Sequence, residues 1–552
     1  MRRVGALVLA ALALGGGVAR AQSSVEEERF FIDKEDEDDD KTLWQGSLTS
    51  TSFIYRESGG QSTALTAGGA TVPNASPFSR LFTELRAQFD GRHIRGGRWD
   101  LRADFRGRMV NTDNINDLVG GGDRGDANRV QSGQFGENEY EVKELYLVRS
   151  GRRTDLFFGR QVIGDLAALK IDGLRLDYAK TARWTYLGFV GAYPLRASRS
   201  VLTDYPRGVD MGGAPTGRVV PVAGGFGAAY RTSRSYGAIG GVAVVPTKKD
   251  TRTGAFEPPR VFVTTNGYAR RSPKLDLYHY VVVDLTGAAG FALTNLTLGT
   301  QYKPSMRLRA NLSVSRVDTE ALDQQIANQL ENVGATIDGA VINNAEVQRI
   351  AADSVRGTVS GAFGRINRFE VTTGLSARRR PEVTLDATLD ANPAADKVLP
   401  ATKAIELLVQ LVDRRFYGGL RLDASYVRGV GLGSASYARS TAQIIRIGAT
   451  KAELKDGKAE LQGDLTIVST ADDNAGAICN PGAIDTCYGS ANTSAVQGTV
   501  VGYYRFKKDW FGNASGSIGM QKIVVTDPGT MLGLPQSTLL TSSLFVRVGY
   551  RF

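Results

Sequence analysis

The sequence predicts an all-β protein: a transmembrane, antiparallel, up-and-down β-barrel of about 22 strands, within a range of about 18 to 24. Three observations lead to this fold class. Short segments in which apolar and polar residues alternate recur from Trp44 to the last residue. The links between these segments are alternately short and long. After the N-terminal segment, no stretch approaches the ~18 to 20 consecutive apolar residues of a membrane helix, so a membrane location requires a closed barrel.

The N-terminal segment has the features of a secretory signal peptide. Met1, Arg2 and Arg3 precede an apolar run over residues 4–14, and Ala19-Arg20-Ala21 provides an A-x-A ending. The apolar run is too short to cross a bilayer as a helix, and a buried N-terminal helix is the alternative. We therefore expect a signal peptide over residues 1–21 and export of the mature chain.

An acidic segment comes next. Residues 22–41 contain ten acidic and three basic side chains, a net charge of −7, in a chain whose net charge is +10. Like charges repel and keep a segment extended, which predicts a solvated periplasmic tail over residues 22–43; binding of a cation or of a basic partner is the alternative. The barrel is expected over residues 44–552. Its basic charge in an exported protein favours lipopolysaccharide, acidic polymers or small anions over nucleic acid.

Each expected strand has one apolar and one polar face, as alternation at period two requires. In the segment 98–110, for example, Trp99, Leu101 and Phe105 alternate with Arg102 and Arg106. The same pattern defines 22 expected strands: 44–56, 80–90, 98–110, 139–150, 154–161, 172–179, 183–193, 223–232, 235–246, 260–270, 275–283, 291–302, 305–317, 353–364, 366–378, 402–412, 415–428, 441–453, 459–471, 496–507, 510–523 and 538–552.

The links give the expected barrel a direction. Short links (151–153, 233–234, 303–304, 413–414 and 508–509) alternate with long ones (57–79, 111–138, 194–222, 318–352 and 472–495), which is the plan of an outer-membrane barrel. An even strand number puts both termini on one side, so we expect short turns in the periplasm and long loops outside. In one outer loop, Cys479 and Cys487 are expected to form a disulfide, because exported chains meet oxidising conditions. With only two cysteines and two histidines, no metal site is expected, and no cofactor.

One long loop differs from the others. Between residues 319 and 352, the spacing of Leu322, Ile326, Leu330 and Val333 suits a short amphipathic helix. We expect it to fold into the lumen as a constriction or to lie over the mouth, with an ordinary surface loop as the alternative.

The C-terminal residues carry a recognisable pattern. Val548, Tyr550 and the terminal Phe552 alternate with Gly549 and Arg551. A final strand that ends in an aromatic residue resembles the C-terminal signal of bacterial outer-membrane proteins, and this resemblance implies recognition by the barrel-assembly machinery. The alternative is an edge strand that happens to end at Phe.

A second, local pattern lies at Gly159-Arg160-Gln161, followed by Asp172-Gly173-Leu174-Arg175. This G-R-Q, short link, D-G-x-R pattern resembles that of porins of the alginate-export and phosphate-selective groups. It covers about 25 residues, and the resemblance implies a channel with a charged lumen.

We expect the polar faces to line a water-filled lumen. The expected lining arginines are Arg86, Arg102, Arg106, Arg108, Arg175, Arg307, Arg309, Arg421 and Arg446, with Glu84, Asp104, Asp177 and Asp423 as counter-charges. Rings of arginine favour anions. The alternative is that these charges pair across strands and only keep the wall wet and stable.

The sequence thus predicts a porin-like channel for small, anionic solutes, in contact with outer-membrane lipid, with a homotrimer left open. A structural, assembly or polymer-export barrel is the alternative. A plugged receptor of similar strand number is disfavoured, because only about 22 mature residues precede the first strand. Catalysis is not expected: His93 falls in a turn, and His279 on an apolar face between Leu277 and Val281.

Overall fold

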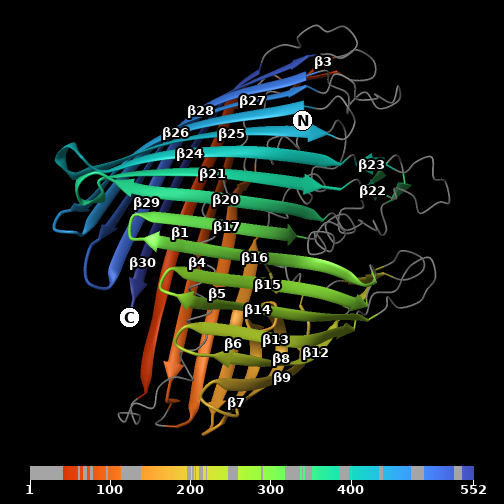
Figure 1. The fold of residues 1–552 in the computed structure, drawn as a ribbon. Helices are drawn as coiled ribbons and strands as arrows, with labels where there is room; N and C mark the ends of the chain where they lie inside the picture. The colour runs from red at the N-terminus through yellow and green to blue at the C-terminus, as the bar shows by residue number, and fades with distance from the viewer. Residues whose placement is uncertain are drawn as a thin grey trace.

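In a computed structural model, the chain forms one closed sheet of 22 antiparallel strands (Figure 1). The structure describes residues 42–59, 62–65, 71–74, 79–94, 97–113, 138–194, 200–201, 204–205, 207–209, 215–218, 220–245, 259–286, 290–317, 336–337, 340–341, 351–381, 383–385, 397–399, 401–433, 439–473, 490–526 and 537–552. Four predictions fall outside these residues: the signal peptide, almost all of the acidic tail, the Cys479–Cys487 disulfide and the helix around Leu330.

The barrel strands are β1 (Leu43–Gly59), β4 (Ser79–Arg92), β5 (Trp99–Asp113), β6 (Glu139–Ser150), β7 (Thr154–Ile163), β8 (Leu169–Ala179), β9 (Trp184–Ala192), β12 (Val222–Arg231), β13 (Ser235–Val245), β14 (Arg260–Ser272), β15 (Leu275–Thr286), β16 (Ala292–Ser305), β17 (Leu308–Val317), β20 (Ala352–Phe363), β21 (Phe369–Arg380), β24 (Thr402–Phe416), β25 (Leu420–Gly433), β26 (Arg439–Leu454), β27 (Ala459–Asp473), β28 (Ser490–Arg505), β29 (Trp510–Thr526) and β30 (Ser537–Arg551).

Four small hairpins belong to the long links: β2 (Ser62–Leu65) with β3 (Thr71–Asn74), β10 (Arg207–Val209) with β11 (Pro215–Arg218), β18 (Thr336–Ile337) with β19 (Ala340–Val341), and β22 (Val383–Leu385) with β23 (Lys397–Leu399). Two 3-10 turns, η2 (Arg365–Asn367) and η4 (Tyr417–Gly419), connect strands. In the described part of the chain, no helix is long and apolar enough to cross a bilayer.

The predicted fold class is confirmed: the sheet is all-antiparallel, has 22 strands and closes on itself. Every predicted strand has a counterpart. The short links gather at the left of Figure 1 together with the end of β30, and the long links lie at the right. These two ends are called the turn end and the loop end below.

Several details of the predicted links are wrong. The turn between β16 and β17 is 306–307 rather than 303–304. The turn before β25 is Tyr417–Gly419 rather than 413–414, because Gly418 (φ 65°) and Gly419 (φ 75°) adopt the left-handed conformation that a tight turn needs. Three links at the loop end have only five residues each, so the alternation of short and long links breaks there: 164–168 between β7 and β8, 287–291 between β15 and β16, and 434–438 between β25 and β26. The β7–β8 link enters the lumen.

The two faces of the wall follow from register and burial. Leu85, Ile239, Leu375 and Val500 are all more than half exposed, and each belongs to the face that also carries the other large exposed apolar side chains of its strand. The opposite face points inward, because on it the Nδ2 of Asn266 in β14 donates to the carbonyl oxygen of Gly164, 3.0 Å away. Gly164 directly follows β7, which is not a neighbour of β14 in the sheet.

All four tryptophans of the chain mark one level of the outer wall. Trp44, Trp99, Trp184 and Trp510 each stand at or next to the first residue of a strand that starts at the turn end, on the outward face, and each is 42 to 49% exposed. Tryptophan is favoured where an apolar surface meets the polar headgroups of a bilayer. The band of exposed apolar side chains above this girdle therefore faces lipid, and the chain is a membrane-spanning barrel.

The seam of the barrel joins the first strand to the last. β1 pairs with β30 from Ser47 opposite Arg551 to Gly59 opposite Leu539, and Gly46 and Phe552 exchange two backbone hydrogen bonds of 3.1 Å. A Cβ at Gly46 would lie 2.7 Å from the Phe552 ring, so only glycine lets this ring cover the seam. The ring also lies 6.0 Å from that of Phe89.

Removal of the Phe552 ring is therefore expected to weaken closure. The variant Phe552→Ala should give less folded barrel, seen as less heat-modifiable protein on gels, because the ring covers backbone hydrogen bonds that close the sheet. Leu540→Ala, at the far end of the same strand and on the same face, is the control. Equal yields for both variants would show that the terminal ring has no special role.

Candidate pore lining and constriction

A dense ionic network covers the inner face of β4, β5 and β6. Arg86 donates to both oxygens of Asp104, at 2.9 and 2.5 Å. Arg102 lies 2.7 Å from Glu144, and Arg108 lies 2.9 Å from Glu84. Arg106 bridges Glu139 and Glu141, each at 2.9 Å. Most of these charges are well buried, so the network stiffens the wall by charge-assisted hydrogen bonds.

This network alters the expected electrostatics of the lumen. Inward acids outnumber inward arginines on β4–β6, because the strands also supply Asp90 and Asp100. The four expected lining arginines of this region thus have carboxylate partners, and the excess charge on this wall is negative.

The positive excess lies on the opposite wall. On β17–β30 the described inward arginines are Arg309, Arg356, Arg378, Arg380, Arg414, Arg421, Arg446, Arg505, Arg547 and Arg551. The described inward acids are Glu370, Glu406, Asp423, Glu460 and Asp464. Within the described part of the chain, no ion pair is formed by Arg309, Arg356, Arg378 or Arg421. The predicted counter-charge Asp423 forms none there either. Arg446 lies 3.4 Å from Asp464. Arg307 stands in the turn before β17 rather than on the wall.

The G-R-Q and D-G residues form the point where the β7–β8 hairpin leaves the wall. β7 pairs with β6 only as far as Arg160 opposite Leu145. Beyond this point Arg160 binds Asp172 through Nε, at 2.6 Å, and donates to the carbonyl oxygen of Val142, at 3.1 Å. Gly159 has a φ of 126°, and a Cβ there would lie 2.3 Å from the Leu145 carbonyl oxygen, so this position requires glycine.

A segment of the β9–β12 link fills the place that the hairpin leaves. The backbone N–H of Val201 donates to the carbonyl oxygen of Tyr140, at 2.8 Å, and so extends the edge of β6. Asp204 accepts a hydrogen bond from Arg160 and is 1% exposed. Described residues of the β9–β12 link thus contact the edge of β6 and Arg160 at the point where β7 leaves the wall.

The link 164–168 is latched to the inner wall. Asp165 accepts hydrogen bonds from Arg231 (2.8 Å) and from the hydroxyl of Tyr236, and lies 3.4 Å from Arg175. Arg175 also binds Asp177 at 2.7 Å, so both predicted residues belong to this latch. Burial opposes ionisation of the Asp165 carboxyl, but Arg231 and Arg175 outweigh it and hold its pKa below the ordinary value. The latch is therefore intact at neutral pH and loosens only as the pH falls below ~3.9.

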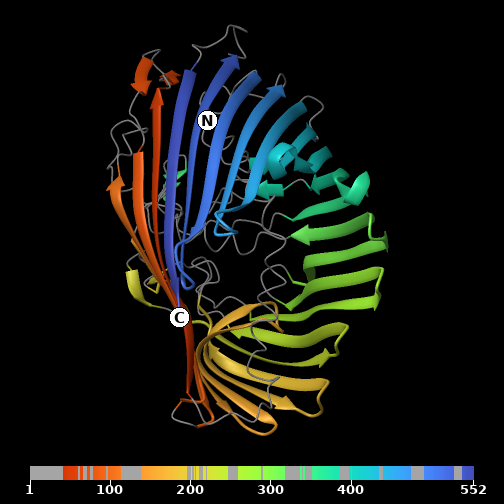
Figure 2. The same cartoon turned by 90° about the vertical axis from the view of Figure 1, so that its left-hand side faces the viewer.

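An apolar core fills the lumen around this latch. Ile163, Leu166 and Ile171 of the hairpin are completely buried against Phe189, Val242, Phe262 and Val282 of the inner wall. The methyl carbon Cδ2 of Leu166 lies where a Cβ at Gly240 would be only 2.4 Å away, so glycine makes room for it. In Figure 2, which looks from the turn end, β6–β13 curl tightly at the lower end of an oval ring, while β17–β30 form the wider arc. The narrow end of the barrel is thus filled by side chains.

The sequence reasoning missed several residues of this lining. Glu139 and Glu141 alternate correctly, but Lys143 is a bulge that shifts the phase and brings Glu144 inward as well. The alternation of β20 and β21 could have revealed Arg356 and Arg378. Asp165 gave no signal, because its partners come from β8, β12 and β13.

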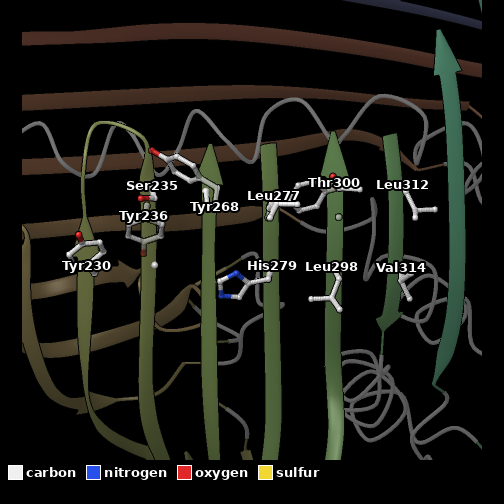
Figure 3. A pocket seen from close by; sticks show the side chains of 14 residues that line it. Tyr230, Ser235, Tyr236, Tyr268, Leu277, His279, Leu298, Thr300, Leu312 and Val314 are labelled. Carbon is white, nitrogen blue, oxygen red and sulfur yellow. The ribbon is translucent and has the colours of Figure 1, made fainter. Parts of the chain in front are cut away.

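A shallow apolar groove of about 570 Å³ lies in the outer wall near the turn end. Figure 3 shows Leu277, His279, Leu298, Leu312 and Val314 side by side on neighbouring strands of this wall. His279 lies on the apolar face, as predicted, and its Nε2 is 3.1 Å from the Thr265 hydroxyl. Within the described residues, no cluster of three His, Cys, Asp or Glu side chains could hold a metal ion.

Comparisons with known proteins add little. No protein-family model and no curated protein sequence matches the chain. Among solved structures, the chain is similar to Pseudomonas aeruginosa OpdQ (8% identity, TM-score 0.37, 92% of this chain and 98% of that chain) and to Acinetobacter baumannii OccAB3 (9%, 0.35, 92% and 99%). A BenF-like porin from Pseudomonas fluorescens Pf-5 gives 10% identity, a TM-score of 0.34, and 92% and 98% coverage. Similarity at this level carries no argument about this chain, whose closed antiparallel barrel is established by its own strand order.

Proposed function

We propose that the protein is a porin-like channel of a Gram-negative outer membrane that passes small, anionic solutes through the wide part of its lumen. The turn end with both barrel termini would face the periplasm. The observation that carries the proposal is the charge of the wide arc, where ten described inward arginines stand against five acids. Such an excess on a low-dielectric wall favours anions.

The expected selectivity depends on the unpaired arginines rather than on the β4–β6 network. Neutralising Arg102, Arg106 and Arg108 would leave acids without partners and would disturb the wall. Arg356 and Arg378 are better targets, because they are diagonal neighbours on β20 and β21 and have no described ion pair to lose.

The proposal is tested by single-channel recording in planar bilayers under a salt gradient. The wild-type reversal potential should show anion preference, weaker at 1 M salt, where the Debye length is about 3 Å, than at 0.1 M, where it is about 10 Å. The double variant Arg356→Gln/Arg378→Gln should move the reversal potential toward cation preference. Arg379→Gln changes the outward neighbour of Arg378 and should have no effect.

The same recordings discriminate the alternative, a structural or polymer-export barrel. Folded protein that inserts into the bilayer but gives no unitary current steps would support that alternative. Current steps with cation preference would support the channel activity but contradict the proposed preference for anionic solutes.

A further inference from the structure

The turn end of the barrel carries an excess of exposed cations. Nine of its ten turns contain at least one Lys or Arg, and the tenth, Tyr417–Gly419, directly follows Arg414, Arg415 and Phe416. The described turn cations, here called the basic ring, are Arg98, Arg152, Arg153, Lys180, Arg183, Arg234, Lys274, Arg307, Arg365, Arg368, Lys455, Lys458, Lys507 and Lys508. The same described turns contain only two acids, Asp456 and Asp509.

The fold itself does not neutralise the basic ring. Within the described part of the chain, Arg368 is the one member in an ion pair, 2.7 Å from Asp413. Lys180 and Lys455 instead lie over the rings of Tyr186 and Tyr504, at 5.9 and 5.2 Å. Burial does not restrain these charges either, because all members except Arg368 are exposed. The ring therefore presents a nearly continuous positive surface to an anionic partner.

The acidic segment of the same chain is joined to the first barrel strand at this ring. The Thr42 hydroxyl donates to the carbonyl oxygen of His93, at 3.0 Å, which fixes the start of β1 at the turn between β4 and β5. The 20 residues before it, 22–41, carry a net charge of −7. Fully extended they reach ~66 Å. A barrel of 22 strands spaced ~4.8 Å apart and tilted by ~40° is ~44 Å across, so the segment can reach every turn.

We propose that the basic ring is the docking surface of residues 22–41 of its own chain. The net charge of −7 of this segment is opposite in sign to that of the ring, whose turns hold 14 described cations and two acids. Attachment at Thr42 keeps the segment at an effective concentration in the millimolar range. Anionic lipid headgroups are the competing occupant, since the tryptophan girdle places the ring near the bilayer surface. The interaction does not depend on the channel activity proposed above.

Carbodiimide cross-linking of the full chain in nanodiscs tests this docking, because the reagent joins a carboxylate to a lysine that touches it. Mass spectrometry should find links from residues 26–40 to ring lysines such as Lys455, Lys458, Lys507 and Lys508. The exposed lysines of the loop end, Lys403 and Lys522, serve as internal controls and should not be linked. The yield should fall about ten-fold at 1 M salt, where the Debye length is ~3 Å.

A second readout is the rate at which a Glu-specific protease cuts within residues 22–41. Lys455→Gln/Lys458→Gln/Lys507→Gln/Lys508→Gln should speed cutting several-fold, whereas Lys403→Gln/Lys522→Gln should not. Three results would overturn the proposal: links only to loop-end lysines or none at all, links only between copies in a mixture of isotope-labelled and unlabelled chains, or links that disappear in anionic lipid at physiological salt. The last result would assign the ring to lipid headgroups.

Discussion

Leu166→Asp is expected to release the β7–β8 hairpin from the inner wall and to raise the single-channel conductance. Leu166 is completely buried in the apolar core of the narrow end, and a carboxylate cannot stay there without a partner. The link 164–168 would swing away and admit water between β9 and β14. Bilayer recording measures the conductance of the folded variant.

The control for this experiment is Ala168→Asp, which adds the same charge at an exposed position of the same link and should leave the conductance unchanged. If Leu166→Asp fails to fold, the milder Leu166→Ala should still fold, at a cost of ~2 to 5 kcal/mol. A folded Leu166 variant with lowered melting temperature and wild-type conductance would mean that the narrow end does not border the current path.

The second large effect is expected from two neighbouring residues of β21 that face opposite environments. Leu375 is 58% exposed on the lipid face near the middle of its strand, whereas Ser376 faces the lumen opposite Glu406. Leu375→Arg should destabilise the inserted barrel by ~2 to 4 kcal/mol, the cost of arginine at the bilayer midplane. Ser376→Arg should cost little, because its side chain meets water and a carboxylate.

Urea unfolding of the two variants in lipid vesicles gives this difference directly, with wild-type protein as reference. A benign Leu375→Arg together with an unstable Ser376→Arg would mean that the two faces of the wall are inverted. Equal losses of unfolding free energy in the two variants would mean that this part of β21 does not contact lipid.

The barrel was predictable because its information is local. The alternation of side chains along 22 segments sets the face of each strand, and Gly418-Gly419 shows how a turn can still shift when two glycines permit a tighter link than polarity suggests. The inward hairpin was not predictable. Its residues Ile163, Leu166 and Ile171 fall in the expected link between the strands 154–161 and 172–179, and their inward packing depends on contacts with β13–β15.

The sequence predicts which residues lie on the polar face of each strand, but not the net charge of the lumen lining. Alternation correctly identified Arg102, Arg106 and Arg108 as polar-face residues, yet their net effect depends on Glu139, Glu141 and Glu144 of the next strand, which a bulge brings into register. Which charges pair across strands depends on the register of neighbouring strands, and the alternation within a single strand does not determine that register.

The seam between β1 and β30 also constrains the order of events in biogenesis. Gly46 and Phe552 exchange hydrogen bonds across almost the whole chain, so this edge of β1 has no partner until β30 has been synthesised. Every partly assembled sheet therefore has two open edges, which are templates for aggregation. Contacts so distant in sequence form slowly. The chain must consequently be kept from self-association until the sheet closes, and closure is expected to be the final step of assembly.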